Sequence, residues 1–134
     1  MDKHLKREGN YRNLFLVAAL YDFVLGFCFF VFWPFIFDHI LKIPHPNYPA
    51  FYQAASAFIF NMGIGFYFVY RNMYQNVDIV KVGICFKLFY IGLAFYYVFV
   101  ANMPWIFSIF GFLDLIFIVF FVLFLRAVRK EVQG

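Results

Sequence analysis

The sequence predicts an all-α, polytopic integral membrane protein with four transmembrane helices in a compact bundle. Of its 134 residues, 66% are hydrophobic and only 13% are charged, whereas a soluble domain has roughly 25% charged residues. Four apolar runs are long enough to cross a hydrocarbon core of ~30 Å, and basic residues gather at alternate ends of these runs. We therefore expect a single membrane domain over residues 1–134, with neither a separate catalytic domain nor a nucleic-acid partner.

The first span is predicted over residues 14–37, an apolar run interrupted only by Asp22 and, near its end, by Pro34. The apolar core of a signal peptide has about 7–15 residues, so we expect this longer run to be retained as a transmembrane helix. Residues 38–49 contain two histidines and three prolines. This composition is typical of an extended connector.

The other three predicted helices cover residues 51–70, 79–100 and 105–125. Pro49 lies just before the first of them, where proline favours the start of a helix. The polar loop over residues 71–76 ends that helix, and Asn76 can cap the next one. Pro104 turns the chain into the last helix. Residues 126–134 are too polar to stay in lipid.

The basic residues predict the orientation of these helices. Nine lie on one side, at Lys3, Lys6, Arg7, Arg12, Arg71, Lys81, Arg126, Arg129 and Lys130. The loops on the other side contain only Lys42. Cytoplasmic loops carry the excess of lysine and arginine, so we expect a multi-pass protein of the bacterial inner membrane with both termini in the cytoplasm.

Polar residues within the predicted spans mark a candidate site. Asp22, Lys87 and Asp114 are ionisable, and Gln53 and Asn61 carry amides. A charged group costs about 2.5–3.5 kcal/mol to insert into a membrane and usually faces the bundle interior. At a rise of ~1.5 Å per residue, Asp22 and Lys87 lie roughly 12 Å from the cytoplasmic ends of their helices, Asn61 roughly 14 Å and Asp114 roughly 16 Å. We therefore expect one polar layer to which each helix contributes a residue.

The charges of this layer allow two interpretations. Lys87 can pair with Asp114 or with Asp22 simply to fix the register of the helices, and the sequence does not decide between the two acids. Alternatively, the layer is a site for a proton, an ion or a polar ligand. Two carboxylates face one ammonium, and the surplus acid must be protonated or meet a cation. The surplus favours the functional interpretation.

Other residues give weaker signals. Asp38, His39 and His45 could hold a divalent metal, but the histidines lack the i, i+4 spacing of a strong site. We expect a solvated loop there and no metal. Cys28 and Cys85 differ in depth, so we expect packing residues rather than a disulfide.

The aromatic residues make up 27% of the chain. Trp33, Trp105 and Tyr48 fit an interfacial belt on the outer side. No cofactor motif is present, and we expect no cofactor, although an aromatic pocket for a quinone, a sterol or another flat lipid is an alternative.

Several short motifs also carry a family resemblance. They are residues 46–53 (PNYPAFYQ), 63–67 (GIGFY), 79–83 (IVKVG) with Lys87, 104–105 (PW) and 114–117 (DLIF). The pattern is similar to that of small uncharacterised bacterial four-helix membrane proteins that resemble the DoxX-like superfamily. The resemblance implies a four-helix bundle, emphasises Gln53, Lys87 and Asp114, and for some members implies an association with respiratory or thiol redox systems and quinones. It carries over no catalytic residue, and this chain lacks a paired thiol.

Together these features predict a non-enzymatic membrane protein, in contact with lipid and part of a homo-oligomer or a larger complex. Its polar layer would bind a small ligand or relay protons, with a redox complex or a quinone as the partner that the resemblance implies. Two alternatives stay open. One is an oligomeric channel or transporter, although the first and third helices are almost entirely apolar outward of the polar layer. The other is a structural or assembly subunit of a membrane complex.

Overall fold

The computed structural model describes residues 7–133, and its regular secondary structure is entirely helical. The elements are α1 (Glu8–Val31), α2 (Trp33–Phe35), the π-helix η1 (Ile36–Leu41), α3 (Pro49–Arg71), α4 (Val77–Val100) and α5 (Ile106–Gln133). The predicted all-α class is confirmed. Each of the four predicted runs overlaps one long helix, and the sequence does not predict α2 and η1. Lys3 and Lys6, which contribute to the predicted orientation, lie outside the described residues.

Three helices in the described part of the chain are long and apolar enough to cross a membrane, namely α1, α4 and α5. This supports a membrane protein. The helix α3 is of similar length, with 23 residues, but it is not among the three. It carries Gln53, Ser56 and Asn61, which lower its apolar character.

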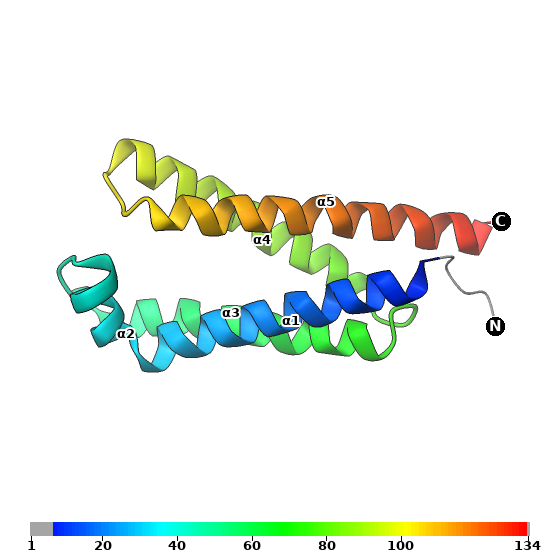
Figure 1. Ribbon diagram of the computed structural model, residues 1–134, viewed down its shortest axis with the longest axis horizontal. Coiled ribbons are helices and arrows are strands. Elements are labelled where there is room, and N and C mark those ends of the chain that lie inside the picture. Colours follow the sequence, from blue (N-terminus) through cyan, green and yellow to red (C-terminus); the bar gives the residue numbers. More distant parts are fainter. Residues whose placement is uncertain (1–6, 134) are drawn as a thin grey trace.

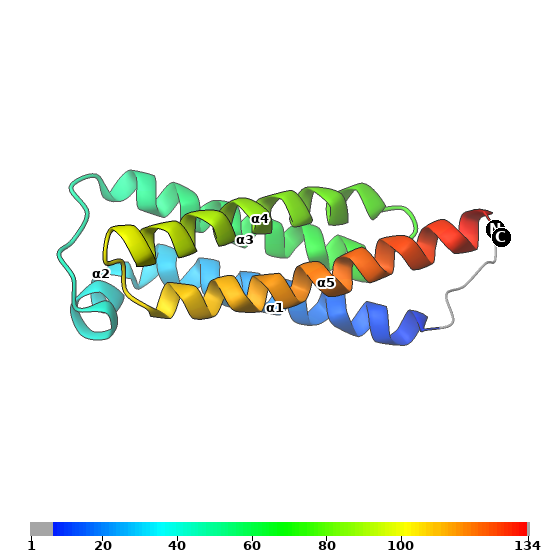
Figure 2. The same cartoon turned by 90° about the horizontal axis from the view of Figure 1, so that it is seen from above.

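The long helices form two antiparallel pairs, α1 with α3 and α4 with α5 (Figures 1 and 2). The start of α1 and the end of α5 lie at the same end of the molecule. The α1 and α3 backbones approach each other closely at Gly26, where an added Cβ would lie 2.5 Å from the Phe60 nitrogen. Glycine at such a contact lets two helices pack backbone to backbone.

The two pairs meet in an aromatic core. The Phe15 ring of α1 stacks on the Phe121 ring of α5 with 5.2 Å between centroids, and the Phe66 ring of α3 lies 5.2 Å from the same Phe121 ring. All three side chains are fully buried. These contacts bring α1, α3 and α5 together in the half of the molecule that contains the start of α1.

The first span differs from the prediction at both ends. The helix α1 begins at Glu8 rather than at residue 14, and it ends at Val31 rather than at residue 37. Proline has no N–H to bond the carbonyl four residues earlier, and its ring clashes with that carbonyl. Pro34 therefore ends the bonding pattern at Phe30, and the chain restarts as α2 and η1.

The connector after the first span is also less extended than predicted. Asp38 to Leu41 belong to the π-helix, which ends at Lys42 in the left-handed conformation with φ 55°. An extended connector was therefore wrong for these residues. The irregular segment is confined to the residues between Lys42 and Pro49, where the other prolines lie.

Asn76 caps a different helix from the one predicted. It precedes α4, but its side chain makes no capping hydrogen bond to α4. Its Nδ2 instead donates to the carbonyls of Phe68 at 3.0 Å and Asn72 at 2.9 Å. These carbonyls lie at the C-terminal end of α3, where helix carbonyls begin to lack intrahelical donors. The Phe68 carbonyl also accepts from the Asn72 N–H at 3.0 Å. The asparagine thus fixes the tight connection between α3 and α4.

Candidate functional site

A buried lysine lies at the centre of the candidate site. Lys87 of α4 has no exposed surface, and its Nζ donates a hydrogen bond to Asp114 Oδ1 of α5 at 2.8 Å. The same Nζ lies 3.8 Å from Asp22 Oδ1 of α1. Asp22 and Asp114 are only 2% and 5% exposed. The structure thus joins three of the five predicted site residues, from three helices, in what we call the Asp22–Lys87–Asp114 cluster.

Aromatic rings enclose the lysine on its other sides. The Lys87 Nζ lies 4.9 Å from the centroid of Phe117, 5.5 Å from that of Tyr21 and 5.7 Å from that of Phe66. The face of an aromatic ring attracts a cation within about 6 Å, and the attraction strengthens when water is absent. The rings therefore stabilise the ammonium group. Among the described residues, its only charged neighbours are the two carboxylates.

The two carboxylates do not play equal parts. Asp114 lies in the same helix pair as Lys87 and accepts its hydrogen bond. Asp22 comes from the other pair, makes a longer contact, and has a buried Oδ2 without a hydrogen-bond partner among the described residues. The geometry assigns Asp114 as the partner of Lys87. Asp22 is then the surplus acid.

The charge balance of the cluster follows from this arrangement. Two ionised carboxylates and one ammonium group sum to minus one. An unpaired charge is very costly in a buried, apolar environment, whereas a neutral group with the same shape costs much less. Uptake of one proton or one cation at the free oxygen of Asp22 removes the surplus charge.

Asn61 does not join the cluster. Its side chain is exposed, although its depth along α3 matches that of Asp22 and Lys87. The buried residues of α3 include Gly63 and Phe66. With about 100° between successive residues, Asn61 lies roughly 200° from Gly63 around the helix. The prediction that α3 contributes Asn61 to the layer is therefore wrong, and Phe66 occupies that place.

Gln53 lies outside the cluster and forms a hydrogen bond with the end of α1. Its Nε2 donates to the Phe30 carbonyl at 3.3 Å. That carbonyl would accept from residue 34 in a continuous helix, but Pro34 has no N–H. Gln53 thus supplies the donor that Pro34 lacks. Its place in the predicted site is not supported, because it caps the end of α1 far along the helix from Asp22.

Tyr21 also belongs to the site, although the sequence does not predict it. Its ring lies against Lys87, and its hydroxyl is buried without a hydrogen-bond partner among the described residues. The position next to Asp22 was the only available signal, and it is weak in a chain with 27% aromatic residues.

The other candidate groups are placed as follows. His45 Nε2 lies 2.8 Å from Asp38 Oδ1, while the His39 ring packs 4.7 Å from that of Phe35. No group of three potential metal ligands occurs in residues 7–133. Cys28 and Cys85 are both free.

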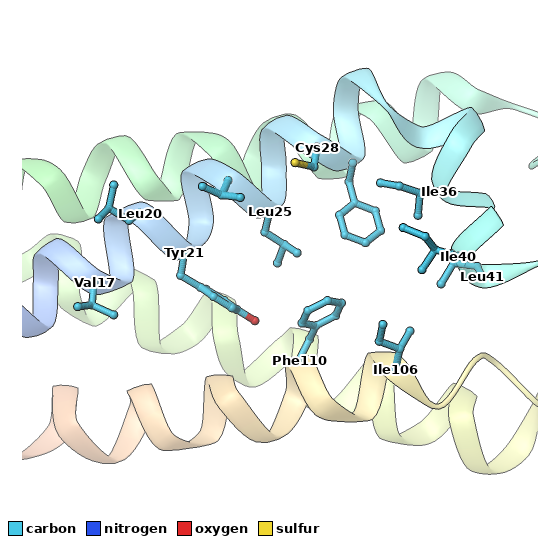
Figure 3. Close-up of a pocket in the computed structure, with 12 residues that line it drawn as sticks. Val17, Leu20, Tyr21, Leu25, Cys28, Ile36, Ile40, Leu41, Ile106 and Phe110 are labelled. Carbon is cyan, nitrogen blue, oxygen red and sulfur yellow. The ribbon is translucent and has the colours of Figure 1, made fainter. Parts of the chain in front are cut away.

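A cleft of about 580 Å³ lies between α1 and α5, with residues of η1 lining one end (Figure 3). Tyr21, which contacts Lys87, also lines the cleft, so the cleft lies beside the cluster. Its walls are apolar and include Leu25, Ile40 and Phe110, with Tyr21 near one end. Small-molecule sites typically have volumes of about 300–1,000 Å³. The cleft is thus large enough for a hydrophobic molecule.

Comparisons with protein-family models, with curated proteins and with solved structures give no match.

Proposed function

We propose that the protein is a small, non-enzymatic subunit of the bacterial inner membrane that relays protons through the Asp22–Lys87–Asp114 cluster. In this proposal all four long helices cross the membrane and both termini lie in the cytoplasm. The close packing of α3 along α1 supports the fourth span, since α3 then lies at the same depth as α1. The basic residues at the start of α1 and the end of α5 support the orientation.

One observation carries the proposal. Asp22 Oδ2 is buried and has no hydrogen-bond partner within residues 7–133, beside a Lys87 that already donates to Asp114. A structural ion pair needs one acid, and the second acid adds a buried charge that the pair does not require. Ionisable groups inside a membrane are rare and commonly form proton relays. Asp22 is the group that we propose to bind and release the proton.

A proton fits this oxygen better than a metal ion does. Ca²⁺ requires six to eight oxygen ligands and Mg²⁺ requires a nearly ideal octahedron. The Asp22–Lys87–Asp114 cluster supplies two carboxylates, and aromatic rings take up much of the remaining space around Lys87. A single proton neutralises the surplus charge without further ligands.

The resemblance to DoxX-like proteins suggests a redox complex or a quinone as the partner of this subunit, in a homo-oligomer or a larger assembly. That partner stays a prediction. The proton relay itself requires no cofactor, because the cluster contains the exchanging group and the cation that orients it.

Proton flux into proteoliposomes tests the proposal. Under an imposed potassium gradient with valinomycin, vesicles containing the wild-type protein should acidify faster than empty vesicles. Asp22→Asn should reduce the rate to that of empty vesicles. The matched control is Asp78→Asn, because the Asp78 side chain is 91% exposed and pairs with Lys81 outside the cluster. Equal rates for the wild-type protein and Asp22→Asn would contradict the proposal.

A further inference from the structure

Two hollows lie along the same side of the contact between α1 and α5. The smaller one, of about 320 Å³, is at the start of α1 and is lined by Arg7, Asn10, Tyr11 and Leu14, with Phe120 and Leu123 of α5. The larger one is the apolar cleft of about 580 Å³ described above (Figure 3). We call the two together the α1–α5 groove.

The spacing of the lining residues shows that the two hollows lie along the same face of α1. Arg7, Asn10, Leu14, Val17, Leu20, Val24 and Cys28 all line one hollow or the other and follow one another at intervals of three or four residues. Residues with this spacing share one face of a helix. The ring contacts of Phe15 with Phe121 and of Tyr21 with Phe117 separate this face from the core. The groove therefore faces outward, toward lipid.

The chemistry of the groove changes along its length. The polar groups are at one end, where Arg7 contributes a guanidinium group, Asn10 an amide and Tyr11 a hydroxyl. Glu8, the acid next to Arg7, does not line either hollow. Beyond Leu14, the walls are almost wholly hydrocarbon. A cationic head region followed by an apolar channel matches a molecule with an anionic head and a hydrocarbon tail.

The dimensions match one leaflet of a bilayer. Ten residues separate Leu14 from Val24, which corresponds to about 15 Å along α1. This is half of the ~30 Å hydrocarbon core. An acyl chain that starts at Leu14 thus reaches Val24 at the depth where the leaflet ends, while its head group lies beside Arg7.

We propose that the α1–α5 groove binds an anionic phospholipid, with its phosphate at Arg7 and Asn10 and one acyl chain in the cleft beyond Leu14. Basic pockets between transmembrane helices on the cytoplasmic side are known to bind anionic head groups. The site depends on α1 and α5 lying in the bilayer, and it is independent of the proton relay at Asp22. Because Tyr21 contacts both the cleft and Lys87, the lipid lies one side chain away from the cluster.

Native mass spectrometry of the full-length protein tests this site. The protein is incubated with phosphatidylglycerol or with phosphatidylcholine that has identical acyl chains. The wild-type protein should retain phosphatidylglycerol about fivefold more tightly, since a basic residue near the surface contributes about 1 kcal/mol to binding an anionic lipid. Arg7→Gln should remove this preference. Arg129→Gln is the control, because Arg129 is exposed at the same end of the molecule and does not line the groove.

A second pair of variants tests the acyl-chain position. Leu20→Trp places a large ring in the cleft and should weaken the binding of both lipids. Leu88→Trp makes the same change outside the groove, at a side chain that is 53% exposed, compared with 54% for Leu20. It should leave binding unchanged. Both variants should fold, because neither residue belongs to the core, and circular dichroism checks this.

Three results would overturn the inference. The first is equal retention of the two lipids by the wild-type protein. The second is an equal effect of Arg7→Gln and Arg129→Gln, which would indicate nonspecific attraction to the positive end of the protein. The third is displacement of the lipid by equimolar inorganic phosphate, which would show that the groove recognises a phosphate and not a lipid. Loss of proton flux in Asp22→Asn has no bearing on these results.

Discussion

Replacing Lys87 with methionine removes the cation of the cluster and keeps a long, unbranched side chain. Asp114 then remains buried without a compensating charge, and Asp22 loses the cation beside it. Breaking a buried ion pair by removing one partner typically costs about 3–5 kcal/mol. We expect Lys87→Met to lower the free energy of unfolding by this amount, and a second substitution then identifies the acid that depends on the lysine.

The distances set the expected difference between the two acids. With an effective dielectric constant of about 20, the attraction between Lys87 and an ionised Asp114 at 2.8 Å is about 6 kcal/mol. The attraction between Lys87 and Asp22 at 3.8 Å is about 4 kcal/mol when Asp22 is ionised, and protonation of Asp22 removes it. Desolvation offsets most of both values. Asp114 also accepts the hydrogen bond, and a hydrogen bond to a charged group contributes about 1.5–3 kcal/mol. The coupling energy of Lys87 with Asp114 should therefore exceed that of Lys87 with Asp22 by about 2 kcal/mol.

A double-mutant cycle measures these couplings. Unfolding in mixed detergent micelles is followed by the fluorescence of Trp33 and Trp105. Asp114→Asn should restore much of the stability that Lys87→Met removes, whereas Asp22→Asn should restore little. If both double mutants are additive within ~0.5 kcal/mol, the charged groups do not interact and the cluster does not exist as described. A larger coupling for Asp22 would contradict its assignment as the surplus acid.

Further predictions concern packing, capping and orientation. Gly26→Ala should destabilise the protein by about 1–3 kcal/mol through overpacking against the α3 backbone. At Gly92 an added Cβ would meet no described atom within 4 Å apart from its chain neighbours and the nearby α4 backbone, so Gly92→Ala should be neutral or stabilising by up to about 1 kcal/mol. The same unfolding assay checks both, and equal effects would contradict the close approach at Gly26. Gln53→Ala should cost about 0.5–1.5 kcal/mol, because a carbonyl at the end of α1 loses its donor; no change in unfolding would show that this bond does not contribute. For orientation, a cysteine at Asn47 should react with an impermeant thiol reagent in intact cells, and one at Gln75 should be protected. Labelling at Gln75 from outside would contradict the proposed topology.

The charged residues of the site could be predicted because their position is controlled by depth in the membrane. Asp22, Lys87 and Asp114 are expensive to expose to lipid, and a constant rise per residue gives their depth directly. The same reasoning was wrong for Asn61, since depth says nothing about rotation around the helix axis. Exposing an amide to lipid costs less than exposing a charge. The cost of membrane insertion therefore does not determine which way Asn61 faces around the α3 axis.

The boundaries of the first span were harder to predict because apolar composition continues past the helix. Residues 32–37 are as hydrophobic as those before them, but Pro34 interrupts the hydrogen bonds at Phe30. The compensating donor is Gln53, which lies 23 residues later in the chain. A hydrogen bond from so distant a residue leaves no local pattern in the sequence. The role of Tyr21 was likewise hidden, because its neighbours come from α4 and α5.

Infrared spectroscopy tests the central claim most directly, because the carbonyl stretch of a protonated carboxylic acid is separate from the bands of ionised carboxylates. At neutral pH, exposed acids with ordinary pKa values of about 4 are ionised. A protonated acid must therefore be one that is buried away from water. We predict that the wild-type protein shows this band, that Asp78→Asn retains it, and that Asp22→Asn loses it. A spectrum of the wild-type protein without the band, or a band that persists in Asp22→Asn, would contradict the assignment of the exchangeable proton to Asp22.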